Sequence, residues 1–75
     1  MTNEPKTIIQ DAITANLAAL SQRLTEAAEL AKQAHEAMAS GEQNQAIGTI
    51  LDFDRMLPEA QALYAAAIAL HRNRS

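Results

Sequence analysis

Two histidines and a few carboxylates are the side chains of this sequence that could bind a metal. His35 is followed by Glu36, and His71 falls close to the end of the chain. A metal site built on packed helices needs a glutamate three residues before its histidine, with further carboxylates facing inward. Lys32 occupies that position before His35, so the motif is incomplete. We therefore expect no metal site and no cofactor.

Catalysis by acids, bases or nucleophiles has equally little to rest on. Asp52 and Asp54 are two residues apart, and on a helix such a pair cannot face one reactant together. Ser21, Thr25 and Ser40 have no histidine at a spacing that would activate a hydroxyl. The sequence also lacks a glycine-rich phosphate loop. We therefore expect a protein that is not an enzyme.

The charge balance bears on nucleic-acid binding. The chain has a net charge of −3 and a pI of about 5.1. A nucleic-acid-binding domain usually carries a basic stripe that neutralises phosphates, and six lysines and arginines spread over 75 residues do not form one. The basic cluster His71, Arg72 and Arg74 fits the C-terminus of a helix, where the helix dipole favours cations. We therefore do not expect nucleic acid as a partner, and a regulator that binds nucleic acid as a dimeric helical bundle is the alternative function.

The N-terminal segment and the apolar runs bear on location. Residues 1–6 lack the basic flank and apolar core of a signal peptide. The longest apolar run is Ala62–Leu70, far short of the roughly 20 residues that span a bilayer. We expect a cytoplasmic protein without a membrane span. There is no cysteine, so disulfides cannot stabilise the single small domain, residues 1–75.

A first helix is predicted over residues 5–39. This stretch has no glycine, and Pro5 lies in the first turn, where a helix tolerates proline. Apolar residues recur at alternating spacings of four and three, which is typical of one helix packed along another. This predicted seam consists of Ile13, Leu17, Leu20, Leu24, Ala27, Ala31, Ala34 and Met38.

A tight turn then reverses the chain. Gly41 can adopt the left-handed conformation that ends a helix, and Ser40 with Gln43 resembles a capping box for the next helix. So short a link predicts an all-α antiparallel hairpin. In that register Arg23 lies opposite Glu59.

The second helix is predicted over residues 43–72, with Pro58 as its discontinuity. A proline inside a helix removes one backbone hydrogen bond and crowds the carbonyl four residues before it. We consider a helix that is kinked at Pro58 but continuous, and alternatively a break that gives helices at about 43–56 and 58–72. The predicted seam of this segment consists of Ala46, Ile50, Phe53, Leu57, Ala60, Tyr64, Ala67 and His71.

The second segment carries more apolar surface than one partner helix covers. Beside its seam runs a further stripe, and a lone hairpin with alanine-rich seams would leave that stripe exposed. We expect two hairpins to pair as a homodimeric four-helix bundle, with a different protein partner or a three-helix monomer folded at Pro58 as alternatives. The predicted function is a small adaptor, chaperone-like or inhibitory protein that acts through apolar helix faces. The residues expected at the dimer or partner interface are Ile47, Leu51, Met56, Leu63, Tyr64 and Leu70.

Overall fold

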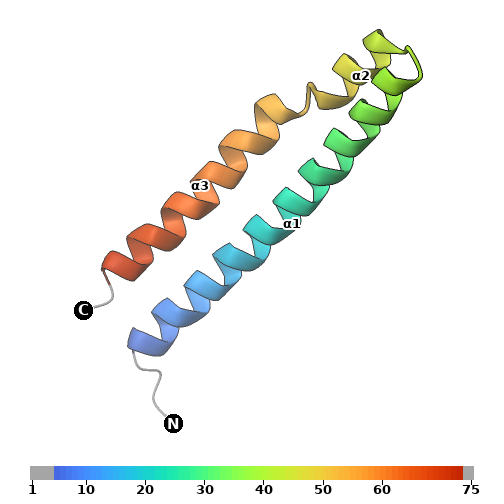
Figure 1. Cartoon of the computed structure of the whole chain (residues 1–75). Coiled ribbons are helices and arrows are strands. Elements are labelled where there is room, and N and C mark those ends of the chain that lie inside the picture. The colour runs from blue at the N-terminus through green and yellow to red at the C-terminus, as the bar shows by residue number, and fades with distance from the viewer. Residues whose placement is uncertain (1–4, 74–75) are drawn as a thin grey trace.

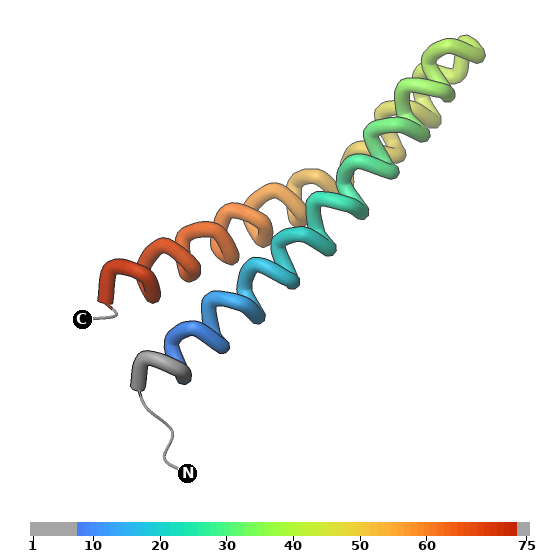
Figure 2. Tube along the Cα trace, turned by 60° about the horizontal axis from the view of Figure 1, so that its bottom comes forward, coloured from blue at the N-terminus to red at the C-terminus, as the bar shows by residue number. Residues whose placement is uncertain are grey.

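The chain forms an antiparallel helical hairpin, seen in the computed structural model of Figure 1. The structure describes residues 5–73, with side chains from Ile8 onward. Helix α1 spans Pro5–Ala39, α2 spans Gln43–Ile50 and α3 spans Phe53–Arg72. Helices α2 and α3 follow one another along α1, as Figures 1 and 2 both show. The all-helical hairpin and the bounds of its first helix are therefore confirmed, and no strand occurs within residues 5–73.

The turn between α1 and α2 is closed by backbone hydrogen bonds. The Glu42 N–H donates to the Ala37 carbonyl at 2.8 Å, and the Gly41 N–H donates to the Met38 carbonyl at 2.9 Å. These two bonds form a Schellman motif, which requires a left-handed residue just after the helix. Gly41 supplies it with φ of 81°. The Ser40–Gln43 capping box is not formed, since Glu42 is the N-cap of α2 and makes no side-chain capping bond.

Alanine dominates the hydrophobic core between the two arms. Among the side chains that the structure describes, seven hydrophobic residues are buried, and Met56 is the one large side chain among them. Near the turn, Ala34, Ala37 and Ala46 pack together, with Ile50 against them. Small side chains let helix backbones approach closely, but each buries little apolar area. The other buried residues are Ala27, Ala60 and Ala67.

The second arm is interrupted at Leu51–Asp52 rather than at Pro58, which corrects the predicted break at Pro58 and the predicted unbroken helix over residues 43–72, whereas the helix does continue through Pro58. Three residues of low helix propensity, Gly48 to Ile50, precede the interruption. There the bonding tightens to three-residue spacing, as the Leu51 N–H donates to the Gly48 carbonyl at 3.4 Å and the Asp54 N–H to the Leu51 carbonyl at 3.1 Å. This is the tighter winding of a 3₁₀ turn. The chain thus passes from α2 to α3 through a local overwinding at Leu51–Asp52.

Pro58 lies inside α3, in its second turn. The hydrogen bond that proline cannot make would have ended on the carbonyl of Asp54. Both residues are exposed, so water can satisfy that carbonyl. A helix break at this position is therefore unnecessary.

The register of the two arms agrees with the predicted one. The Arg23 Nε lies 3.3 Å from a carboxylate oxygen of Glu59, joining α1 to α3. Any two residues that lie opposite one another on the two arms therefore have numbers that add up to about the same total as those of Arg23 and Glu59. We say that such residues lie at the same height along the hairpin.

Candidate interaction surface

The residues that could do chemistry do not converge. His35, Glu36, Asp52, Asp54 and His71 are all exposed. Across residues 5–73, no three histidine, aspartate or glutamate side chains lie close enough together to hold a metal ion. The candidate site is therefore a surface, and its geometry begins with which helix faces meet.

The observed seam of α1 shares half of its residues with the predicted one. Ile13, Leu20, Ala27 and Ala34 are buried or half-buried, as expected. The alternate members differ, because α1 turns the residue before each predicted one toward the other arm. Those inward residues are Asn16, Arg23, Leu30 and Ala37, whereas Leu17, Leu24, Ala31 and Met38 are exposed.

The polar members of this seam are bonded within the hairpin. The Asn16 amide donates to the Ala12 carbonyl at 2.8 Å. Arg23 contacts Glu26 on its own helix and Glu59 on α3, both at 3.3 Å. Because these polar groups are hydrogen-bonded or ion-paired, Asn16 and Arg23 can lie half-buried at the edge of the seam while Leu17 and Leu24 face outward.

The second arm shows the same displacement after its interruption. Up to Phe53 the seam follows the prediction, but the next inward residue is Met56 instead of Leu57. The tight turn at Leu51–Asp52 accounts for this, because overwinding advances the seam by three residues twice in succession. The predicted members Leu57, Tyr64 and His71 are consequently exposed. The observed seam is Ala46, Ile50, Phe53, Met56, Ala60, Leu63, Ala67 and Leu70.

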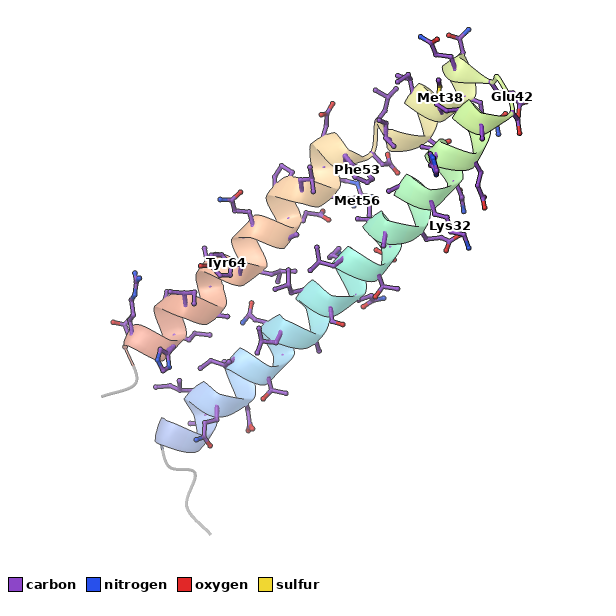
Figure 3. The ribbon with its side chains drawn as sticks, viewed as in Figure 1. Lys32, Met38, Glu42, Phe53, Met56 and Tyr64 are labelled. Carbon is purple, nitrogen blue, oxygen red and sulfur yellow. The ribbon has the colours of Figure 1, made fainter. Side chains whose placement is uncertain are left out.

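The six residues predicted for a partner interface are divided by this arrangement. Met56 is 3% exposed and lies between α3 and α1 (Figure 3), so it belongs to the core of the hairpin. Leu63 and Leu70 are half-buried along the same seam. Ile47, Leu51 and Tyr64 are 50%, 61% and 57% exposed. The structure therefore leaves three of the six available on the surface of the hairpin.

One flank of the hairpin is apolar. Its members each follow a seam residue by one position, on both arms. In an antiparallel pair, equivalent flanks of the two helices lie on the same side, so these residues form one surface. We call it the apolar flank; it consists of Leu17, Leu24, Ala31 and Met38 on α1, Ile47 on α2, and Leu57 and Tyr64 on α3. A shallow hollow of about 460 Å³ lies on its α1 side, beside Leu17 and Leu24.

The other flank is charged. Arg23 pairs with Glu26 and Glu59, and Arg55 pairs with Glu59 at 3.0 Å and with Asp52 at 3.8 Å. We call these five residues the charged flank. Their side chains are 36–68% exposed, so each pair contributes only a few tenths of a kcal/mol. The cross-arm contact of Arg23 with Glu59 confirms that the equivalent flanks of α1 and α3 share a side.

Sequence reasoning found the excess of apolar surface but assigned part of it to the wrong side of the helix. Leu17, Leu24 and Met38 were placed in the seam, and the structure exposes them. Apolar spacing gives no signal for the observed seam, because that seam has Asn16 and Arg23 where the predicted one has Leu17 and Leu24.

The comparisons with known proteins add no family. No protein-family model, no curated protein and no solved structure matches this chain. Within the described residues, no helix combines the length and the apolar character needed to cross a membrane.

Proposed function

We propose that this protein is a small non-enzymatic interaction module, an adaptor, chaperone-like or inhibitory protein, whose apolar flank is covered by a second helical chain. Two hairpins packed face to face as a four-helix bundle are the assembly that fits this surface, and a homodimer is the state we favour. The observation that carries the proposal is the apolar flank, which exposes large hydrophobic side chains on both arms.

The width of the apolar surface supports a bundle. Helices in a two-stranded coiled coil need one narrow apolar seam, whereas helices in a bundle carry a third apolar position beside it. Both arms show that third position, as Leu24 and Leu57 illustrate. Each is about half exposed in the hairpin, at 50% and 51%. A second hairpin would bury what remains.

The distribution of charge also supports contact with a protein chain. Between Leu17 and Met38, the residues of α1 that follow a seam residue by one position include no lysine, arginine, aspartate or glutamate. On α3, Asp54 is the one charged residue that the described part of this surface carries. Depletion of charge at the centre of a surface patch is characteristic of protein interfaces.

The thin core gives such an interface a structural purpose. Six of the seven buried hydrophobic residues are alanines. A hairpin of this size buries little apolar area, so its stability as a monomer should be marginal. Covering the apolar flank would add leucine, isoleucine, methionine and tyrosine side chains to the core.

The molar mass in solution tests the proposal. Sedimentation equilibrium over a wide concentration range is expected to show an assembly that dissociates on dilution. Leu24→Asp places a charge at the centre of the apolar flank and is expected to yield monomers with reduced helicity.

Gln22→Asp is the matched control, because it adds the same charge to an exposed position of α1 outside the apolar flank. It is expected to retain the wild-type mass. A fully helical monomer at every concentration would sink the homodimer, and equal effects of the two substitutions would show that the apolar flank is not an interface.

A further inference from the structure

We infer that the occupant of the apolar flank is a second copy of this chain lying with its turn at the opposite end, so that α1 packs on the partner's α1 and α3 on the partner's α3. This inference rests on the proposed function and specifies its partner and geometry. Face-to-face packing of two identical hairpins allows two arrangements, with the turns together or apart. Three features of the structure separate them.

The size of the surface is sufficient for self-association. The hairpin measures 59 × 19 × 12 Å along its principal axes. Its broad face therefore offers on the order of 1,000 Å², and a standard stable interface buries about 800 Å² per partner. A copy of the same length covers the whole face, including Met38 near the turn and Tyr64 on the other side of the midpoint.

The distribution of charge along the hairpin favours turns that lie apart. From Arg23 through the turn to Glu59 the chain has seven carboxylates and three cations. Toward the open end, the described side chains contribute Asp11 and Arg72, which balance. Turns placed together would bring two acidic halves side by side. Turns placed apart set each acidic half beside the neutral end of the other copy, which lowers the repulsion.

Steric complementarity along α1 favours the same arrangement. The Arg23–Glu59 pair lies near the middle of the hairpin, so a two-fold axis there gives full overlap of two copies. The axis then sets Leu24 against its own symmetry mate. It also sets Leu17 of each copy against Ala28 and Ala31 of the other, so that a large side chain packs against small ones at two symmetric places.

The third feature concerns the polar groups of the α3 surface. Asp54 and Tyr64 are both exposed and both lie on the side of α3 that continues the apolar flank. The same two-fold axis brings Asp54 to the height of the partner's Tyr64. A phenol that donates to a carboxylate satisfies both groups within an otherwise apolar interface. With the turns together, Asp54 would instead face the alanines of α1 around Ala28.

Distance measurement between two copies tests the arrangement. The chain has no cysteine, so Ser40→Cys in the exposed turn places one spin label per chain. Pulsed electron paramagnetic resonance is expected to give a separation of about 50 Å, from twice the rise between the midpoint and the turn. Turns together would give less than about 20 Å, since neighbouring helices lie 8–10 Å apart.

Substitutions at the cross-copy contact provide a second readout. Tyr64→Phe and Asp54→Asn are each expected to raise the dissociation constant about tenfold, and the double variant no further than either alone. Asp52→Asn, on the charged flank, is the matched control and is expected to leave that constant unchanged.

The outcomes separate the two proposals. A dimer with a short label distance, or with additive effects of Tyr64→Phe and Asp54→Asn, overturns this arrangement and leaves the interaction module standing. A mass that stays monomeric at all concentrations overturns the second copy as occupant. A wild-type mass for Leu24→Asp in the same experiment overturns the proposed function itself.

Discussion

The two flanks of this hairpin carry opposite kinds of side chain on the same pair of helices. The charged flank satisfies itself, because Arg23 and Arg55 each reach two carboxylates within 4 Å. The apolar flank has no counterpart within the chain, and Leu17, Leu24, Leu57 and Tyr64 are each at least half exposed. The contrast shows that the seam does not sit at the centre of the apolar surface. It is displaced toward the charged flank, which leaves the other side of the apolar surface exposed.

The largest expected effect comes from the seam that supports both flanks. Met56→Ala removes the one large side chain that is buried among residues 8–73, at 3% exposure. The free energy of unfolding should fall by about 2–5 kcal/mol, the usual loss when a buried methionine is truncated. Urea denaturation followed by circular dichroism measures it.

Ile8→Ala is the control for this substitution, because Ile8 is 55% exposed and lies outside the apolar flank. It is expected to change the free energy of unfolding by less than about 0.5 kcal/mol. Comparable losses for Met56→Ala and Ile8→Ala would mean that Met56 is not a core residue.

Polarising the apolar flank should weaken association more than folding. Leu17 is 50% exposed in the hairpin, so a second copy would bury about half of a leucine, worth roughly 1 kcal/mol per chain. Leu17→Gln should therefore raise the dimer dissociation constant about 30-fold, because two copies are affected. Sedimentation or dilution calorimetry measures this constant.

Ala15→Gln makes the matched comparison, since Ala15 is exposed and lies outside the apolar flank. It is expected to leave the dissociation constant unchanged within about twofold. A similar weakening by both glutamines would contradict the distinction between the flanks.

A smaller and opposite effect is expected at Gly48, near the interruption of the second arm. A Cβ atom at this position would meet nothing within 4 Å. Gly48→Ala should raise the free energy of unfolding by about 0.4–1 kcal/mol, because alanine restricts the unfolded chain and favours helix. Thermal melts at fixed concentration test this expectation.

Gly41→Ala is the contrasting variant. At Gly41 there is equal space, but φ is 81°, so an alanine is strained there and should destabilise the hairpin. A destabilisation of the same size by Gly48→Ala would mean that residue 48 does not adopt ordinary helical geometry.

The smallest effect should come from the charged flank. A double-mutant cycle of Arg23→Ala and Glu59→Ala should give a coupling free energy of a few tenths of a kcal/mol, because both side chains are more than a third exposed. The coupling should fall between 50 mM and 1 M salt. A coupling above about 2 kcal/mol would show that this flank is covered in solution.

The sequence was sufficient for the hairpin itself. The spacing of apolar residues, the lack of glycine before Gly41 and the single tight turn predicted the bounds of α1 and the fold-back. The Arg23–Glu59 contact was also predicted, because a short turn fixes the register of the two arms. These features depend on local conformation and on counting residues from the turn.

The choice of seam could not be predicted in the same way. On α1, the apolar content of Leu17 and Leu24 exceeds that of Asn16 and Arg23, so periodicity alone selects the wrong set. Arg23 faces inward because the carboxylate of Glu59 lies across the seam. This ion pair is a tertiary contact, and the spacing of residues along one helix does not predict it.

The position of the interruption was missed for a related reason. Proline is the strongest single helix breaker, so by propensity Pro58 outweighs the weaker breaking signals of the residues from Gly48 to Ile50. Several small preferences and the packing of Ile50 against Ala34, Ala37 and Ala46 determine where the chain is tightened. The one-residue difference between Met56 and Leu57 follows from that displacement.

The alanine-rich seam has a consequence for the temperature dependence of stability. The heat-capacity increment of unfolding scales with the apolar area that becomes exposed, and it is about 12–15 cal/mol/K per residue in ordinary globular domains. Six alanines and one methionine account for the buried hydrophobic residues in the described part of this chain, so its own share of that area is small. The stability curve of a single hairpin should therefore be flat, with a broad melt and little curvature. A steep, strongly curved profile would have to draw its heat capacity from the leucines of the apolar flank.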